Sequence, residues 1–307
     1  MIAVAGASPT QASDCSVVAT VKEVGPGIYV RPGQPRELFG ENPYANVGFV
    51  VGEECIAIID TGGGVPEGDA LRCAAEQVAD VPICYVILTH YHFDHAYGTA
   101  PFRALSRGRK PEVIGHARLR RALEQSATYY LPRLAQARSY KMTPDDIVVP
   151  DRTVARGETL VLDLGGRELA LTAHSPAHTD NDLSVLDRKT GTLWLSDLLF
   201  VDHVPTIDSS TGSLLGWLEL LDELADAPAT QAVPGHGPNA VKWPSGRDNL
   251  KRYLSVVRDE TRVVIENGGT ITDAQGTVAK DEASRWQHFN VHHRRTVQKA
   301  FTELEWE

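Results

Sequence analysis

Residues 89–95 read THYHFDH, and this short stretch decides the interpretation of the whole sequence. It directly follows the apolar run ICYVIL at residues 83–88, whose length and lack of alternation predict a buried strand. Three histidines and one aspartate fall within six residues, and burying them beside such a strand is costly unless something binds them. Imidazole nitrogens and carboxylate oxygens are ligands that suit Zn²⁺, Fe or Mn. The stretch therefore predicts a metal site.

The spacing of these residues indicates two metal positions rather than one. Side chains alternate along an extended chain, so His90 and His92 face the same way and can hold one ion. If a helix begins near Phe93, the side chains of Asp94 and His95 turn toward a second position.

Three isolated residues further along the chain lie where additional ligands are expected. His178 falls in a predicted turn between two strands, Asp197 ends the strand-like LWLSD, and His236 follows QAVPG. Groups that bind ligands in α/β proteins commonly lie at the carboxyl ends of strands. Seven candidate ligands thus converge from four strand ends.

The pattern H-x-H-x-D-H, followed by a distant His, Asp and His, resembles the metallo-β-lactamase superfamily over about residues 21–238. The resemblance implies an α/β fold, a four-layer αββα sandwich with extra C-terminal helices, and metals at one edge between the sheets. It implies two Zn²⁺ ions, and it implies that Asp60 in IIDTGGG supports the site from behind. The implied metal ligands are His90, His92 and His178 for the first ion, Asp94, His95 and His236 for the second, and Asp197 as a bridge.

The same resemblance implies a hydrolase that acts on a small molecule. A metal-bridging hydroxide would attack an ester, thioester, lactone or amide, with Asp94 as the catalytic residue that orients it. At the bridging position this sequence has Asp197, and in this it resembles glyoxalase II-like thioesterases and lactonases. The true zinc β-lactamases typically have a residue other than aspartate there. His203 lies six residues after Asp197 and is the candidate substrate contact.

The sequence is also consistent with two functions other than a dinuclear hydrolase. The first is a mononuclear iron enzyme similar to persulfide dioxygenases. The second is a non-catalytic accessory of a periplasmic quinoprotein system. The iron alternative follows from the resemblance to the superfamily, which includes such enzymes. The accessory role follows from a narrower resemblance to metallohydrolase-like proteins encoded beside quinoprotein dehydrogenases or sulfur-oxidation systems, which rests on residues 177–187, 197–221 and 301–307.

Composition restricts the class of protein. The 307 residues are 42% hydrophobic and 23% charged, as is typical of globular proteins, and no apolar run is long enough to span a membrane. The 30 Lys and Arg against 40 Asp and Glu give a net charge of −10, which argues against nucleic acid as a partner. The sequence leaves a homodimer open.

The chain is predicted to form one domain over residues 16–307, with a helical C-terminal region from about 246. Residues 1–15 are interpreted as a disordered tail or the remnant of an export signal, because the stretch is small and polar but lacks a charged start and a full apolar core. Export would place the protein in the periplasm, and otherwise it is cytoplasmic. Cys55 and Cys84 are interpreted as core thiols, although the sequence does not decide whether Cys15, Cys55, Cys73 and Cys84 form disulfides.

Other histidines are assigned structural or surface roles. His174 is interpreted as a packing residue, and His292 and His293 as part of a solvated helix face. Tyr129 and Tyr130 fall in a segment that overhangs the pocket in the resembled family, together with Tyr140, so one of the three is a candidate substrate contact.

Overall fold

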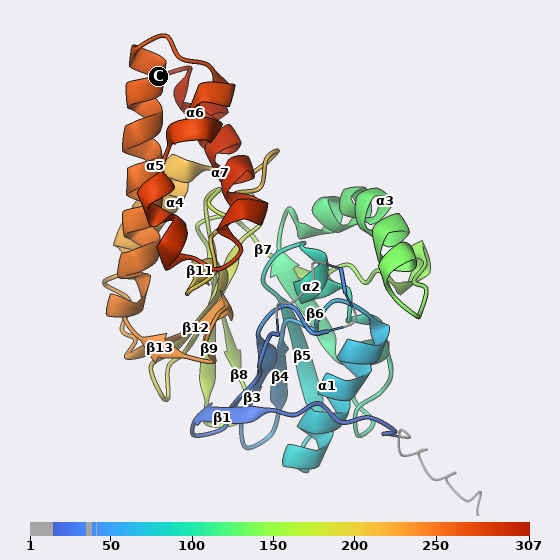
Figure 1. Ribbon diagram of the computed structural model, residues 1–307. Helices are drawn as coiled ribbons and strands as arrows, with labels where there is room; N and C mark the ends of the chain where they lie inside the picture. The colour runs from blue at the N-terminus through green and yellow to red at the C-terminus, as the bar shows by residue number, and fades with distance from the viewer. Residues whose placement is uncertain (1–14, 35–38, 41) are drawn as a thin grey trace, which may run out of the picture.

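The computed structural model describes residues 15–34, 39–40 and 42–307, so the predicted N-terminal tail lies outside the described residues except for Cys15. Two β-sheets form the centre of the molecule (Figure 1). The first has the strand order β1 (Lys22–Gly25), β2 (Ile28–Arg31), β3 (Val47–Val51), β4 (Ile56–Ile59), β5 (Ile83–Leu88), β6 (Glu112–His116) and β7 (Arg152–Val154). The second has the order β13 (Val241–Lys242), β12 (Gln231–His236), β11 (Thr192–Phe200), β10 (Leu183–Asp187), β9 (Glu168–Ala173) and β8 (Thr159–Asp163).

Helices cover the outer face of each sheet, which confirms the predicted αββα sandwich. The first sheet carries α1 (Val65–Val78), the short α2 (Phe93–Ala96) and α3 (Leu119–Ala137) (Figure 1). The second carries α4 (Leu214–Leu224), α5 (Asp248–Glu266), α6 (Ile271–Thr277) and α7 (Phe289–Leu304). Within the described residues, no helix has the length and apolar character needed to cross a membrane.

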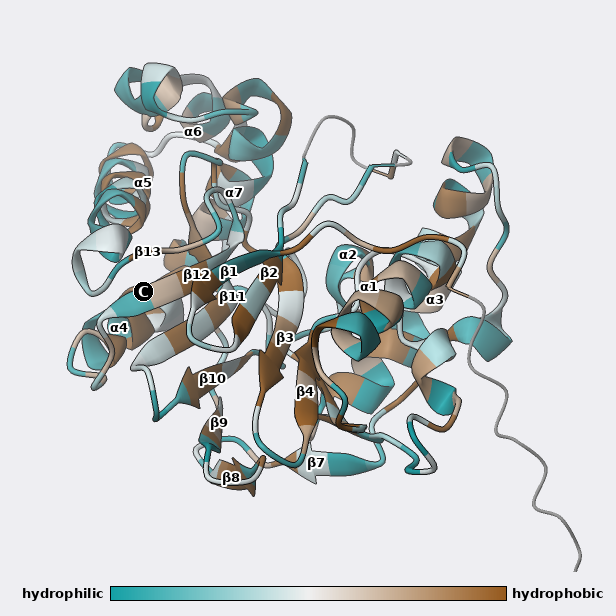
Figure 2. Ribbon diagram, turned by 90° about the horizontal axis from the view of Figure 1, so that it is seen from below, coloured by the Kyte–Doolittle hydropathy of each residue, from teal (hydrophilic) through white to brown (hydrophobic). Residues whose placement is uncertain are grey.

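Strand β4 shows why its sequence is an unbroken apolar run. Its side chains alternate between the two faces of the sheet. Ile56 and Ile58 pack in the core beneath the helices, whereas Ala57 and Ile59 pack between the two sheets. Both faces are therefore buried, and hydrophobic residues concentrate on β3 and β4 (brown in Figure 2).

A helix does begin at Phe93, as the sequence indicates, but it is only four residues long. It ends at Ala96, and a separate 3₁₀ turn follows at Ala100–Arg103. Gly98 lies between them with its N–H donating to the carbonyl of Gly62 at 2.8 Å. A Cβ at this glycine would lie 2.2 Å from the carbonyl oxygen of Thr61, so close backbone approach ends the helix here.

The prediction of a solvated face at His292 and His293 is wrong. Both residues lie on the buried face of α7, which packs against α5 and α6. His293 accepts a hydrogen bond from the Tyr253 hydroxyl at 2.8 Å and donates to the carbonyl of Val278 at 3.0 Å. His293 therefore satisfies both of its ring nitrogens inside the helical layer.

The interpretation of Cys55 and Cys84 as core thiols is also wrong, because they form a disulfide. Their strands β4 and β5 run parallel with Ile56 opposite Ile83, which brings the two Cα atoms to 5.6 Å. Cys15 and Cys73 form a second disulfide, with Cα atoms 5.7 Å apart, and tie the start of the described chain to α1. No free cysteine remains in the described part of the chain.

Reduction of the disulfides should lower the free energy of unfolding by several kcal/mol. The bridges join residues 58 and 29 positions apart, and bridges closing loops of such lengths typically contribute about 2–4 kcal/mol each. Thermal unfolding with and without a phosphine reductant measures the effect, and thiol titration in denaturant should find no free thiol before reduction. A Cys15→Ser/Cys73→Ser variant, which keeps one bridge, should show an intermediate loss. Four titratable thiols in the untreated protein would contradict the prediction.

Candidate metal centre

All seven predicted ligands meet at one edge of the sandwich, where the two sheets approach each other. His90 follows β5, and the next three ligands lie at or in α2, which begins directly after His92. His178 comes from the loop between β9 and β10, and His236 is the last residue of β12. The strand containing Asp197 continues to Phe200 rather than ending at the aspartate.

An irregularity in β11 determines where Asp197 points. The register with β12 shifts on both sides of Ser196, which has a left-handed backbone with φ of 48°. Such irregularities re-aim a side chain at a sheet edge. A Cβ on the neighbouring Gly235 would lie 1.9 Å from the Asp197 carboxylate, so only glycine leaves room for it.

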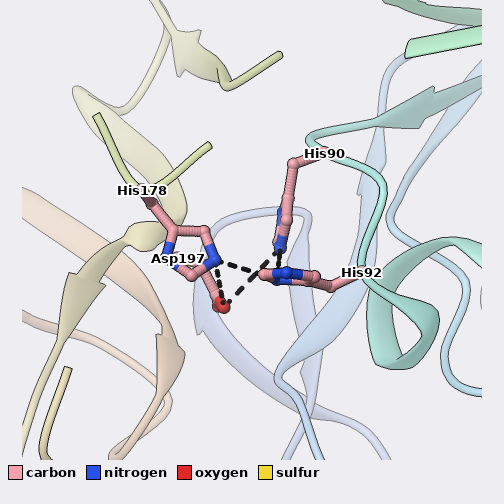
Figure 3. A group of neighbouring side chains, drawn as sticks. All are labelled: His90, His92, His178 and Asp197. Carbon is pink, nitrogen blue, oxygen red and sulfur yellow. Dashed lines mark hydrogen bonds and ion pairs between the residues drawn. The ribbon is translucent and has the colours of Figure 1, made fainter. Parts of the chain in front are cut away.

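The first group of ligands brings three imidazoles and one carboxylate together (Figure 3). Nδ1 of His92 lies 3.0 Å from Nε2 of His90 and 2.9 Å from Nε2 of His178. Oδ2 of Asp197 lies 3.2 Å from Nε2 of His178 and 3.6 Å from Nε2 of His90.

The second group lies on the other side of the same carboxylate. Oδ1 of Asp197 is 3.0 Å from Nε2 of His95 and 3.3 Å from Nε2 of His236. Oδ2 of Asp94 is 3.5 Å from Nε2 of His236 and 3.7 Å from Nε2 of His95. Asp197 thus faces the first group with one oxygen and the second with the other.

Metal coordination accounts for the arrangement of the ligand nitrogens and oxygens better than hydrogen bonds among them do. Nε2 of His95 and Oδ1 of Asp197 are buried and have no hydrogen-bond partner, although they lie 3.0 Å apart. Within each group the ligand atoms all lie within 4.8 Å of one another. Unsatisfied buried polar atoms are rare, and converging nitrogen and oxygen lone pairs are the arrangement that a divalent cation satisfies.

Burial and the neighbouring charges prepare His92 and Asp197 to act as ligands. Burial, reinforced by His178, lowers the pKa of His92 to about 3, so this imidazole is neutral at pH 7. Burial alone would raise the pKa of Asp197, but the imidazoles of His95 and His236 hold it well below its usual range. A neutral imidazole and an ionised carboxylate are the forms that bind metal.

Asp60 supports the ligands from behind, as the resemblance implied. Its Oδ2 lies 2.8 Å from Nδ1 of His95 and accepts hydrogen bonds from the hydroxyls of Thr89 and Ser196. The Thr89 hydroxyl also lies 3.1 Å from Nδ1 of His90. Hydrogen bonds of this kind fix the ring orientation and tautomer of metal-binding histidines.

Two residues near the centre, Asn46 and Tyr44, cannot be identified from the sequence pattern. Asn46 donates from Nδ2 to the carbonyl of Pro234 at 2.9 Å, and its N–H donates to the carbonyl of Gly235 at 2.8 Å. It thereby ties the loop before β3 to the strand that carries His236. Tyr44 packs its ring 5.1 Å from that of His236. Neither has a sequence signal, because each acts on a strand about 190 residues away.

Of the candidate substrate contacts, His203 and Tyr130 lie close to the ligand groups. His203 lies at the centre, with its ring 5.8 Å from that of His236. Tyr130 lies 6.4 Å from the ring of His92, whereas Tyr129 packs against Tyr130 from a more exposed position. Tyr140 contacts Arg138 beside the loop at residues 62–64. His174 accepts or donates a hydrogen bond with Ser184 at 2.7 Å and is not among the ligand groups.

Comparison with known proteins agrees with this geometry. A family model described as the metallo-beta-lactamase superfamily matches residues 41–236. No curated protein matches. Among solved structures, the stereoselective inverting sec-alkylsulfatase Pisa1 from Pseudomonas sp. has a TM-score of 0.71 at 16% identity, over 93% of this chain and 50% of its own. This chain therefore spans about half the length of that alkylsulfatase.

Two metallo-beta-lactamases are similar over nearly their full length. The enzyme from Pontibacter korlensis has a TM-score of 0.60 at 18% identity, over 77% of this chain and 98% of its own. FIM-1 from Pseudomonas aeruginosa, in its mono-zinc form, has a TM-score of 0.60 at 17% identity, over 80% and 98%. These identities show a shared fold. With the family match covering well over half of the sequence, the chain belongs to the metallo-β-lactamase superfamily, and the expectation of a metal-dependent hydrolase is met at the level of that family.

Proposed function

We propose that this protein is a dinuclear zinc-dependent hydrolase that cleaves a thioester, lactone or related ester of a small molecule. The observation that carries the proposal is the Asp197 carboxylate, whose two oxygens face two separate ligand groups at 3.0–3.6 Å. A carboxylate between two such groups suits a pair of divalent cations. When bound, such ions lower the pKa of water to near 7 and polarise a carbonyl oxygen.

The residues of the chain would position the ions and the nucleophile. Asp94 directs Oδ2 toward His95 and His236, where it would help to hold the second ion. The Asp94 carboxylate would also orient the attacking hydroxide. Asp60 keeps the ring of His95 in place through the 2.8 Å contact to Nδ1.

The metal content of the purified protein tests the proposal directly. We expect two equivalents of zinc per chain after reconstitution with excess zinc and removal of loosely bound metal. The reason is that both ligand groups are complete and share Asp197. Elemental analysis measures the ratio. A plateau at one equivalent under saturating conditions would contradict the dinuclear proposal.

The identity of the bridging residue leads to a prediction about substrate class. Because this position is an aspartate, kcat/KM for thioesters or lactones should exceed that for β-lactams. A panel of thioester, lactone, aryl ester, amide and β-lactam substrates measures this, and the similarity to an alkylsulfatase adds sulfate esters to the panel. A preference for penicillins or carbapenems would contradict the assignment.

An iron enzyme similar to persulfide dioxygenases is the alternative that metal analysis separates. Such an enzyme needs one metal position, and it would purify with about one equivalent of iron and consume oxygen with a persulfide. The second ligand group, Asp94, His95 and His236, favours the dinuclear hydrolase because all three are buried and converge.

We also propose that the protein is exported and works in the periplasm, where disulfides persist. The two disulfides support this, because such bridges are rare in the reducing cytosol. An association with quinoprotein dehydrogenases or sulfur oxidation is part of the same proposal and rests on the sequence resemblance. Fractionation of cells expressing the full-length protein tests the location, and a reduced cytoplasmic pool would contradict it.

A further inference from the structure

The C-terminal helical region reaches the candidate metal centre through the segment just before α7. Gln287 bridges the loop after β11: its N–H donates to the carbonyl of Asp202 at 2.7 Å, and its carbonyl accepts from the N–H of Val204 at 3.1 Å. This pairing sets the ring of His288 4.6 Å from the ring of His203. His203 in turn lies against the metal-ligand candidate His236.

His203 has an unused polar atom inside the protein. The residue is 4% exposed, and its Nε2 has no hydrogen-bond partner. A buried polar atom without a partner calls for an explanation, and a bound ligand is one. His288 is partly exposed, so the pair has a side that opens toward solvent.

The backbone of His288 also carries an unusual conformation. Its φ is 58°, in the left-handed region that residues with a side chain rarely adopt, and it forms the N-terminal boundary of α7. Strained backbone of this kind concentrates at ligand-binding and catalytic sites, where the surrounding structure maintains it. Here the Gln287 bridge is that support.

The chemistry around His203 favours an acceptor oxygen. The charged or titratable side chains that interact electrostatically with His203 are three imidazoles, those of His236, His288 and His292, and one carboxylate, that of Asp197. The oxygens of Asp197 face the two ligand groups. Arg295 on α7 adds a positive charge near His292. Imidazole N–H groups suit a carboxylate, which accepts hydrogen bonds and carries a negative charge.

We propose that His203 and His288 form a subsite that binds a carboxylate of the substrate, on the side of the centre formed by Asp94, His95 and His236. The subsite belongs partly to the C-terminal helical region, which thereby contributes to specificity. The inference rests on the proposed hydrolase function and names the class of substrate. This is an ester or thioester whose acyl chain carries a free carboxylate at the end opposite the bond that is cleaved.

Two thioesters of the same thiol test this subsite in the zinc-loaded enzyme. The succinyl and butyryl thioesters have the same chain length and differ in carrying a terminal carboxylate or a methyl group. The wild type should prefer the succinyl thioester. His203→Phe keeps a ring of similar size but no N–H, and it should lower kcat/KM for the succinyl thioester about 10- to 100-fold, as expected for a lost hydrogen bond to a charged acceptor.

The same variant should lower kcat/KM for the butyryl thioester by a clearly smaller factor, so that the succinyl-to-butyryl ratio of kcat/KM falls about 10-fold or more, with zinc content equal to that of the wild type. His203→Asn retains an N–H donor and should recover part of the preference, and it also serves if the phenylalanine variant fails to fold. His288→Phe should lower the preference in the same direction. His174→Phe is the matched control, a buried histidine outside the centre, and should leave the ratio of the two substrates unchanged.

The outcomes separate this inference from the proposed function. A wild type that hydrolyses thioesters without preferring the succinyl substrate, or a preference that survives both phenylalanine variants, overturns the subsite alone. An equal loss on both substrates accompanied by loss of zinc would show that His203 supports His236 instead, and would also overturn it. A zinc-loaded wild type inactive on every ester and thioester overturns the proposed function and the inference with it.

Discussion

Replacing Asp94 with alanine should lower kcat at least about a hundredfold while the protein stays folded. Asp94 is buried and directs Oδ2 toward His95 and His236, so its removal takes away both a metal ligand and the group that orients the attacking water. Losing one oriented catalytic contact typically costs about 10²–10³ in rate, and losing a ligand should cost at least as much. Steady-state kinetics measures the loss, and elemental analysis should find metal falling toward one equivalent.

His174→Ala is the control for this experiment. His174 is also a buried histidine, with its Nε2 2.7 Å from the hydroxyl of Ser184, but it belongs to neither ligand group. Its replacement should leave kcat within about tenfold, and a larger effect should appear as lost stability. Turnover near that of the wild type in Asp94→Ala would mean that this aspartate lies outside the working site.

The largest expected effect of a single substitution on stability comes from a buried ion pair outside the metal centre. Arg167 donates from Nε and Nη2 to the two carboxylate oxygens of Asp187 at 2.9 and 2.8 Å, and the side chains are 4% and 3% exposed. Its Nη1 also donates to the carbonyls of Pro26 and Val51, at 2.9 Å each, which joins the second sheet to the first. Arg167→Ala should therefore lower the free energy of unfolding by about 3–5 kcal/mol, because it leaves a buried carboxylate without its partner.

The pH dependence of that loss follows from the pKa of Asp187. Burial acts to raise this pKa, but the hydrogen bonds from Arg167 and Thr190 outweigh burial and hold it below the ordinary value of 3.8. A depressed pKa means that the carboxylate stabilises the fold above about pH 4 and that this contribution is lost as the pH falls through the folded-state pKa. Denaturant unfolding at pH 7 and at pH 3 should show a smaller difference between wild type and Arg167→Ala at the lower pH.

Arg188→Ala is the matched control, since Arg188 pairs with Glu168 at 2.8 Å but both side chains are about half exposed. Exposed pairs contribute about 0–1 kcal/mol. Equal losses in the two arginine variants would contradict the role assigned to the buried pair.

The local sequence carried the resemblance to the family and named the candidate ligands. The HYHFDH segment places four metal-binding side chains within six residues, and such a cluster beside a buried strand has few physical explanations other than a metal. His178, Asp197 and His236 could be named because each lies near the end of a strand whose apolar run is recognisable by itself. The strand Ile83–Leu88 has the bounds that its apolar run predicts, because a strand packed on both faces is apolar throughout.

Tertiary structure alone decided several contacts between residues distant in the chain. The pairing of Cys55 with Cys84 follows from the parallel register of β4 and β5, and the burial of His292 and His293 follows from the face that α7 presents to α5 and α6. The meeting of His203 with His288 depends on a backbone bridge between segments about 85 residues apart. The hydrophobic period of a segment predicts whether it forms a helix or a strand and which of its faces is apolar. It carries no information about which other element packs against that segment. These contacts therefore become known only from the folded structure.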